Sequence, residues 1–447
     1  MNNLYLDKQF YHIYPLGFCG APEYNDFVSA PENRLALIEQ WIPHMKEIGV
    51  NALYLGPLFE STKHGYDTAD YFRIDRRLGG GEYFKRLTDI LHQNDIKVIL
   101  DAVFNHVGRD FPAFRDLKAN GSASKFRDWF KNVNFNASSP RGDNFSYESW
   151  NGHYELVKLD TAHPEIKEYF KSAVGKWIDD FGIDGIRLDA CDCLDFGFLK
   201  DLSSFCKDKK PDFWIMGEII HGDYNKWANN EMCDSVTNYE CYKGLWSSFN
   251  DSNFFEIAYS LNREFGDSGL YKGKALYNFV DNHDVDRVAS VIKEKVHLHP
   301  LYILLYSMPG IPSLYYGSEW GLTGKKVNGS DAPMRPFIDL EAMRRDPVDE
   351  HLTATVRKLA EIRTASKSLK YGNYRQLHIN HKQFAFAREH DGERTAVFVN
   401  SDKDLVKVKA PQRIAGRDIL NNEDIDVPVG GELALYPNWG RIIISGN

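Results

Sequence analysis

Eight short apolar runs rich in β-branched and aromatic residues recur within the first 320 residues, and helical patterns separate most of them. The runs are nearly continuous in apolar residues, which is typical of parallel strands that are buried on both faces. The clearest helical pattern extends from Ile166 to Phe181 and ends at Gly182, a common helix terminator. Eight strand-plus-helix units predict a (β/α)8 TIM barrel. The eight runs are FYHIYPLGF (10–18), ALYLGPLF (52–59), KVILDAVF (97–104), GIRLD (185–189), FWIMGE (213–218), SVTNY (235–239), ALYNFVDN (275–282) and PSLYYGSE (312–319).

Two segments depart from this repeat. The step from Val103 to Ile186 takes 83 residues, and the polar, aromatic stretch 107–162 within it predicts a loop domain inserted after strand 3, on the active face. Toward the C-terminus, short alternating runs with a DG turn predict an antiparallel β-sandwich over 371–447. The barrel is then assigned to 1–106 and 163–370.

Three of the apolar runs lead into carboxylates, at Asp189, Glu218 and Asp284. Glu218 follows Asp189 by 29 residues, about one strand-plus-helix unit, and Asp284 follows Glu218 by 66, about two units. The C-terminal ends of barrel strands share one face, where active sites lie. Any one of these acids alone fits an ion pair or a cap at a strand end equally well, but packing does not easily explain all three. Together they indicate hydrolysis or transfer of glycosidic bonds.

The residues around the three acids suggest a role for each. Asp189 is the predicted nucleophile, because Arg187, two residues earlier in a strand, lies on the same side and can hold it ionised. Glu218 is the predicted general acid and base, since the apolar residues FWIM before it raise its pKa. Asp284, beside His283, is predicted to contact sugar hydroxyls or to stabilise the developing oxocarbenium charge.

Two further side chains are predicted to contact the sugar. His106 follows the third strand run, and Tyr66 lies in a loop of the active face. Aromatic residues make up 14% of the chain, and an aromatic ring offers a flat apolar surface on which a pyranose can stack. Tyr66 is the ring predicted to act as such a platform.

Composition narrows the classes of partner. The net charge of −9 leaves no basic patch for nucleic acid, so a neutral or polar small substrate is expected. The N-terminal residues lack a basic region followed by a long apolar core, and no apolar run reaches the roughly 18 residues that span a bilayer. The six cysteines form no CxxC pair, which predicts free thiols in a reducing compartment. We therefore expect a cytoplasmic protein with no membrane partner.

Six strings, in order along the chain, resemble the α-amylase family of glycoside hydrolases, family 13. Any one of them is a weak signal, but six in register are very specific, and the resemblance covers essentially the whole chain. Within the family, GEIIHGDYNKW and SYESWNGHYELVKLD are most similar to neopullulanases, cyclomaltodextrinases and maltogenic amylases, although Ile220 stands where that group commonly has a Trp. The six strings are HGYDTADYFRID (64–75), DAVFNH (101–106), GIRLDA (185–190), GEI (217–219), FVDNHD (279–284) and GIPSLYYGSE (310–319).

The resemblance implies a barrel, a loop domain and a C-terminal sandwich, and it implies the same three acid roles. It implies substrate contacts from Tyr66, His106, Arg187 and His283. It also implies that Asp331 and Arg335 bind the sugar on the non-reducing side of the cleaved bond.

No cofactor is required for such chemistry, but many family members bind a structural calcium ion. The resemblance points to Asn105 with Asp110 or Asp143 for such an ion. No loop of the DxDxDG type is present, so the sequence leaves metal binding open.

The favoured hypothesis is a retaining glycoside hydrolase that cleaves α-1,4-glucosidic bonds in maltooligosaccharides and related α-glucans through a covalent glycosyl-enzyme intermediate. The alternative is a 4-α-glucanotransferase, in which a sugar hydroxyl replaces water. A third hypothesis is a non-catalytic glycan-binding protein, because a fold alone does not fix function. Chain-length preference, acceptance of α-1,6 bonds and oligomeric state stay open.

Overall fold

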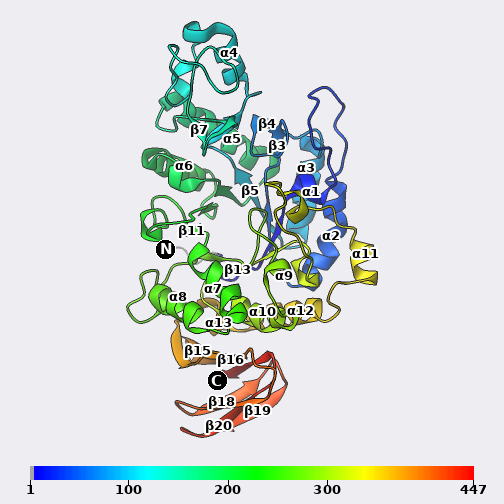
Figure 1. Cartoon of the computed structure of the whole chain (residues 1–447), viewed down its shortest axis with the longest axis vertical. Helices are drawn as coiled ribbons and strands as arrows, with labels where there is room; N and C mark the ends of the chain where they lie inside the picture. Colours follow the sequence, from blue (N-terminus) through cyan, green and yellow to red (C-terminus); the bar gives the residue numbers. More distant parts are fainter. Residues whose placement is uncertain (1–4, 447) are drawn as a thin grey trace.

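The computed structural model describes residues 5–446, and at its centre eight parallel strands form a nearly closed barrel (Figure 1). Thr237, just after β11, bridges to Tyr277 of β12 and so connects the two edge strands of the sheet. The predicted (β/α)8 barrel is therefore confirmed. In spatial order the strands are β11 (Ser235–Val236), β10 (Trp214–Gly217), β9 (Gly185–Leu188), β5 (Lys97–Ala102), β2 (Ala52–Leu55), β1 (Phe10–Ile13), β13 (Ile311–Tyr315) and β12 (Tyr277–Asn278).

Each barrel strand lies within or overlaps one of the eight predicted runs, but most strands end earlier than the run does. The run at 10–18 was expected to be one strand, and that expectation is wrong: β1 ends at Ile13 and a helical turn, α1 (Pro15–Phe18), follows. Pro15 has no N–H for a sheet ladder and has the backbone angle of a first helical residue, so it ends the strand. The strands are short because the chain leaves the barrel in order to form the loops of its active face.

Helices surround the barrel, and the predicted helix before Gly182 is present. It runs from Pro164 to Phe181, and Gly182 adopts a left-handed φ of 70°. The surrounding helices are α2 (Ala36–Glu47), α3 (Gly81–Gln93), α5 (Pro164–Phe181), α6 (Phe196–Lys209), α7 (Tyr239–Asn250), α8 (Phe255–Phe265), α10 (Leu298–Ser307) and α12 (Leu352–Ala365). Shorter helices are α9 (Val288–Val291), α11 (Leu340–Arg345) and α13 (Lys367–Tyr371).

The inside of the barrel is filled by side chains from its strands. Trp214 and Met216 of β10 belong to one buried apolar cluster with Phe10, Tyr54 and Ile99. A barrel filled in this way is a packed core and not a pore. Polar side chains that follow the strands therefore lie at the C-terminal end of the barrel, beyond this apolar core.

Two small antiparallel sheets lie at the strand ends. One pairs β3 (Phe59–Ser61) with β4 (Thr68–Ile74), and the other joins β6 (His106–Gly108), β8 (His153–Lys158) and β7 (Ser149–Trp150). The second sheet and α4 (Pro112–Asn120) belong to the segment between β5 and α5, which Figure 1 shows at one end of the molecule.

The C-terminal part of the chain forms an antiparallel sheet at the opposite end of the molecule (Figure 1). A second, two-stranded sheet packs on it through a separate apolar cluster that includes Phe398, Val408 and Leu433. Buried Arg388 donates to the backbone oxygen of Ser307 at 2.8 Å and so attaches the sheet to the barrel. The six-stranded sheet has the order β14 (Arg375–Ile379), β15 (Gln383–His390), β16 (Glu393–Asn400), β21 (Trp439–Ser445), β18 (Ile414–Asp418), β19 (Glu423–Val427), and the smaller one pairs β17 (Val406–Lys409) with β20 (Glu432–Leu435).

Candidate active site

Asp189 directly follows β9, and its backbone N–H still donates to Ala102 of the neighbouring strand at 3.1 Å. Arg187 lies inside β9 and is buried, and its Nη1 contacts Asp189 Oδ1 at 2.8 Å. This contact follows from the sequence, because residues two apart in a strand lie on the same face. The structure thus brings Arg187 and Asp189 together as predicted.

Glu218 directly follows β10, the strand next to β9. Its Oε1 lies 2.7 Å from Arg187 Nη2, and its Oε2 accepts the backbone N–H of Ala190 at 3.0 Å. Ala190 has a left-handed φ of 43°, which non-glycine residues rarely adopt. This strained residue turns its N–H toward Glu218, and such strain is a common feature of functional sites. Asp189 and Glu218 therefore contact two nitrogens of one guanidinium.

Asp284 lies in the loop after β12 and is the most exposed of the three acids, with 38% of its side chain exposed. His283 Nε2 lies 2.9 Å from its Oδ2, and Arg335 Nη2 lies 3.1 Å from its Oδ1. Arg335 also contacts Asp331 at 3.0 Å. Arg335 thus connects Asp331, its predicted partner, to Asp284.

Asp101 of β5 connects these groups, although it was not among the predicted site residues. Arg187 donates to both of its oxygens, at 2.9 and 3.1 Å. Tyr54 and Tyr66 donate to its Oδ2, at 2.8 and 2.9 Å. The Tyr66 hydroxyl also contacts His283 Nε2, so an unbroken chain of polar contacts links Arg187 to Asp284. Asp101 is the only charge inside the run VILDAVF, and that isolated charge could have identified it.

Arg187 is one cation shared by several acidic side chains, and burial shifts the pKa values of these acids. Burial raises the pKa of Glu218, as predicted, and Arg187 opposes the rise. Burial also raises the pKa of Asp189 well above its ordinary value, because Glu218, Asp101 and Asp284 add to it and Arg187 offsets only part. The expectation that Arg187 holds Asp189 ionised is therefore corrected, because the pKa of Asp189 is raised despite this contact. Where like charges share a buried site, one of them retains a proton.

Asp284 differs from the other two acids. Burial opposes its ionisation, but the charge and hydrogen bond of His283, together with Arg335, lower its pKa below the ordinary value. Asp284 is thus held as an anion while Asp189 and Glu218 compete for a proton. This separation of pKa values provides both an acid and a base within one site.

Three buried imidazoles at the site have ring nitrogens without a hydrogen-bond partner among the described residues. These are His12 Nε2, His106 Nε2 and His283 Nδ1. Burial lowers the pKa of His106 to about 3 and that of His12 well below its ordinary value, so both rings are neutral. His12 stacks on Tyr54 with ring centres 4.2 Å apart, and His106 stacks on Trp150 at 5.9 Å. Buried polar atoms are nearly always paired, so these nitrogens suit the hydroxyl groups of a ligand.

The proposed calcium ligands do not fit a cation. Asp143 accepts from Arg109 through both oxygens, at 2.7 and 2.8 Å. Asp110 accepts from Thr62 at 3.0 Å, and the Asn105 side-chain nitrogen lies 3.2 Å from His106 Nδ1. Calcium needs six to eight oxygen ligands, and here a guanidinium already neutralises the principal acid. Across residues 5–446 no cluster of three or more acidic, His or Cys side chains is arranged to hold a metal ion.

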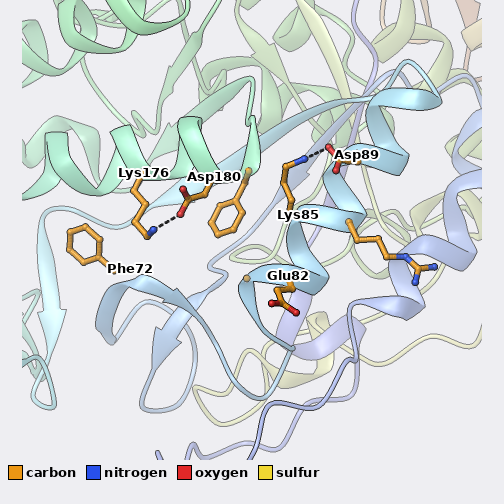
Figure 2. A pocket seen from close by; sticks show the side chains of 9 residues that line it. Phe72, Glu82, Lys85, Asp89, Lys176 and Asp180 are labelled. Atoms are coloured by element: carbon orange, nitrogen blue, oxygen red, sulfur yellow. Dashed lines mark hydrogen bonds and ion pairs between the residues drawn. The ribbon is translucent and has the colours of Figure 1, made fainter.

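A depression lies outside the barrel, between α3 and α5, and none of the predicted site residues lines it (Figure 2). Most of its charged side chains are paired, Lys85 with Asp89 and Lys176 with Asp180 within their own helices, and Arg86 with Glu39 of α2. No acids share a cation here as they share Arg187, so this depression offers no comparable chemistry. In the part of the chain that the structure describes, no helix is both long enough and apolar enough to cross a bilayer.

Comparisons with known proteins agree with this geometry. Residues 34–352 match the family model described as the catalytic domain of alpha amylase. A cyclomaltodextrinase from a Bacillus species is 32% identical over 426 residues, which cover 89% of this chain and 73% of that protein. Neopullulanase 2 from Thermoactinomyces vulgaris is 33% identical over 429 residues, covering 91% and 69%.

A solved structure with the same overall architecture contains a bound sugar. It is the cyclic α-maltosyl-(1→6)-maltose hydrolase from Arthrobacter globiformis in complex with cyclic α-maltosyl-(1→6)-maltose. It is 25% identical to this chain, with a TM-score of 0.83, and the match covers 98% of each chain.

Proposed function

Since the chain belongs to the α-amylase family and is an α-glucan hydrolase, we propose that it cleaves α-1,4-glucosidic bonds of maltooligosaccharides with retention of configuration. The observation that carries this proposal is the Arg187 guanidinium, which contacts Asp189 with one nitrogen and Glu218 with the other. One cation that contacts two carboxyl groups keeps them close together, and retaining glycosidases need them about 5 Å apart.

In the first step, Glu218 gives its proton to the glycosidic oxygen while Asp189 attacks the anomeric carbon. The bond from that carbon to the leaving oxygen breaks, and an ester to Asp189 forms. Asp284 remains an anion and stabilises the positive charge that develops on the sugar ring. Its low pKa, maintained by His283 and Arg335, suits this role.

In the second step, Glu218 acts as the base. It removes a proton from water, whose oxygen attacks the anomeric carbon and displaces Asp189. The sugar keeps its original configuration because two inversions have occurred. Arg187 contacts both carboxyl groups, so it can stabilise whichever of them carries the charge in each step.

The sugar ring is proposed to lie between Asp284 and the buried imidazoles. The free nitrogens of His12, His106 and His283 then contact hydroxyl groups that would otherwise be bound to water. Tyr66, the predicted platform, also bonds Asp101 and His283, so its ring has a fixed position. Asp331 and Arg335 are proposed to contact the next sugar on the non-reducing side.

The test is the release of reducing sugar from maltohexaose by wild type and by Asp189→Asn. We expect the wild type to release the α-anomer first and the variant to release no sugar. Unchanged activity in the variant would remove Asp189 as the nucleophile, and initial release of the β-anomer would remove retention.

Transfer to a sugar acceptor is the second candidate activity, and Ile220 favours it. This side chain lies two residues after Glu218 and is 45% exposed. An apolar side chain beside the acid favours a sugar face over water at the second step. A ladder of longer oligosaccharides from maltotriose, with little glucose, would support transfer over hydrolysis. Pullulan and β-cyclodextrin in the same assay test whether α-1,6 bonds and cyclic substrates are accepted.

A reducing, cytoplasmic environment is proposed from the cysteines. All six of them lie in the described chain as free thiols, and five are buried. Oxidising compartments favour disulfides, whereas reducing ones keep thiols free. We propose an α-glucan oligosaccharide as the partner and no required cofactor.

A further inference from the structure

The loop between α1 and α2 is held rigidly against the segment that leads to Tyr66. Buried Arg77 donates to the backbone oxygens of Pro22, Glu23 and Lys63, at 3.1, 2.9 and 2.7 Å. Asn25 adds a side-chain bond to the Ser61 oxygen at 3.0 Å. In Figure 1 this dark-blue loop rises beside β3 and β4, at the same end of the barrel as the insert.

The end of α1 and the start of this loop also touch the segment that carries Arg335. A Cβ atom added at Gly17 would lie 1.9 Å from the Arg335 backbone oxygen, so only glycine permits this approach. A Cβ at Gly20 would lie 3.3 Å from the Phe337 ring. The loop and residues 335–337 are therefore neighbours, and Arg335 itself contacts Asp284 at 3.1 Å.

Two aromatic side chains project from these fixed segments into solvent. Tyr24 is 62% exposed and Phe337 is 55% exposed. Lys63 Nζ lies 4.9 Å from the centre of the Tyr24 ring and pairs with Glu23 at 2.8 Å. Lys63 is also the residue before His64, whose backbone oxygen accepts the Tyr14 hydroxyl at 2.7 Å. The two exposed rings thus lie on segments that adjoin the site: Phe337 is two residues after Arg335, and Tyr24 contacts Lys63, the neighbour of His64.

We propose that Tyr24 and Phe337 form an outer binding site for a glucose unit on the non-reducing side of the cleaved bond. This inference rests on the proposed function and extends it, because it assigns the enzyme a preference for chains longer than the innermost sites can hold. The backbone at both residues is fixed while the rings are exposed, so a ligand that stacks on them loses little conformational entropy. Pyranose rings have apolar C–H faces that suit aromatic rings.

The polar groups beside the rings suit the same ligand. Lys63 and Glu23 form an exposed ion pair, with 42% and 65% of their side chains accessible. Together they offer donors and an acceptor for hydroxyl groups without a net charge. A neutral oligosaccharide matches this combination better than an anion or a cation does.

The test compares kcat/KM for maltohexaose with kcat/KM for maltotriose, in wild type, Tyr24→Ala and Phe337→Ala. Loss of one stacking ring should lower the ratio by about 2- to 10-fold in each variant. The short substrate should react at nearly the wild-type rate. Tyr24→Phe keeps the ring and should keep the ratio.

Two controls separate this site from general effects on the surface. Val28→Ala alters an exposed side chain on the same loop, and Tyr259→Ala removes an exposed ring on α8. Neither should change the ratio. Thermal unfolding of every variant confirms that it is folded.

An unchanged ratio in both alanine variants would overturn the inference while leaving the proposed function intact. Calorimetry distinguishes the opposite case. Maltoheptaose is titrated into Asp189→Asn, with and without Tyr24→Ala. In that case wild type cleaves no maltooligosaccharide while Tyr24→Ala still weakens this binding 2- to 10-fold. That result would support the outer site and contradict the proposed function. Equal maltoheptaose affinity with and without the Tyr24→Ala substitution would also contradict the outer site.

Discussion

Two arginines, one at the barrel centre and one in the insert, each bind carboxylates, but the ratio of acids to cation differs between them. Arg187 contacts Asp101, Asp189 and Glu218, so three acids share one cation. Arg109 pairs with Asp143 alone, through two parallel bonds. The excess of acids at the barrel centre raises pKa values and provides protons for chemistry, whereas the balanced pair in the insert only holds the loop in place.

The largest expected contrast comes from removing one acid in each region. Asp189→Asn should lower kcat/KM for maltohexaose by about 10⁴-fold or more, since it removes the proposed nucleophile. It should not lower the melting temperature at pH 7. A carboxyl with a raised pKa in the folded state destabilises that state as the pH rises from the unfolded-state pKa through the folded-state pKa. Asparagine does not ionise, so the variant does not lose this stability as the pH rises.

Calorimetric melting at neutral and at acidic pH measures this effect. The matched variant is Asp143→Asn, which should lose stability and keep activity. A large loss of stability in Asp189→Asn would show that Arg187 needs all three acids, and the contrast between the two regions would be false.

Removing the central cation should have the next largest effect. Arg187→Met removes the cation that three buried acids share, and breaking a buried pair costs about 3–5 kcal/mol. Loss of a preorganised donor that contacts both reacting carboxyls should lower kcat by about 10²- to 10³-fold. Arg187→Lys keeps the positive charge but loses the two guanidinium nitrogens that contact separate carboxyls, so its activity should lie between that of wild type and that of Arg187→Met. Wild-type activity in Arg187→Met would remove the guanidinium from the mechanism.

The pH dependence of kcat/KM reports the raised pKa of Glu218. Because burial raises that pKa, the acid should keep its proton above the ordinary value of 4.5. On the alkaline side the rate should fall about tenfold per pH unit once Glu218 ionises. Glu218→Gln should be far less active and should lack this alkaline limb. An alkaline limb near 4.5 in wild type would contradict the raised pKa.

The sequence predicts the barrel well because its strands are buried on both faces and so leave continuous apolar runs. It also places Arg187 beside Asp189, because the two-residue period of a strand is a local property. Contacts between distant segments are not predictable in this way. The connecting role of Asp101, the N–H that Ala190 turns toward Glu218 and the Arg109–Asp143 pair all depend on tertiary packing.

The pKa of Asp189 was mispredicted for the same reason. The sequence reveals Arg187 two residues away but not the burial, nor that Glu218, Asp101 and Asp284 act on the same carboxyl. A single local partner predicts a lowered pKa, whereas the complete set of neighbours and the burial raise it.

In the insert, the Arg109–Asp143 pair should contribute modestly to stability. Arg109→Met and Asp143→Asn should each lower the free energy of unfolding by about 1–2 kcal/mol, because the pair is bidentate but partly exposed. Activity toward maltotriose should change by less than about threefold, since neither side chain touches the central acids. Urea unfolding of both variants and of the double variant measures the coupling between the two residues. If activity falls as far as in Arg187→Met, the insert takes part in the chemistry.

The smallest expected effect is that of removing metal ions. Wild type treated with a calcium chelator should keep its melting temperature and its activity, because the Arg109 guanidinium occupies both oxygens of Asp143 that an ion would use. A loss that calcium reverses would contradict this. Arg109→Met sharpens the test, since it frees both oxygens of Asp143 without supplying a counter-charge. If the guanidinium excludes the ion, this variant alone should gain stability on addition of calcium, in proportion to the logarithm of the calcium concentration above its dissociation constant.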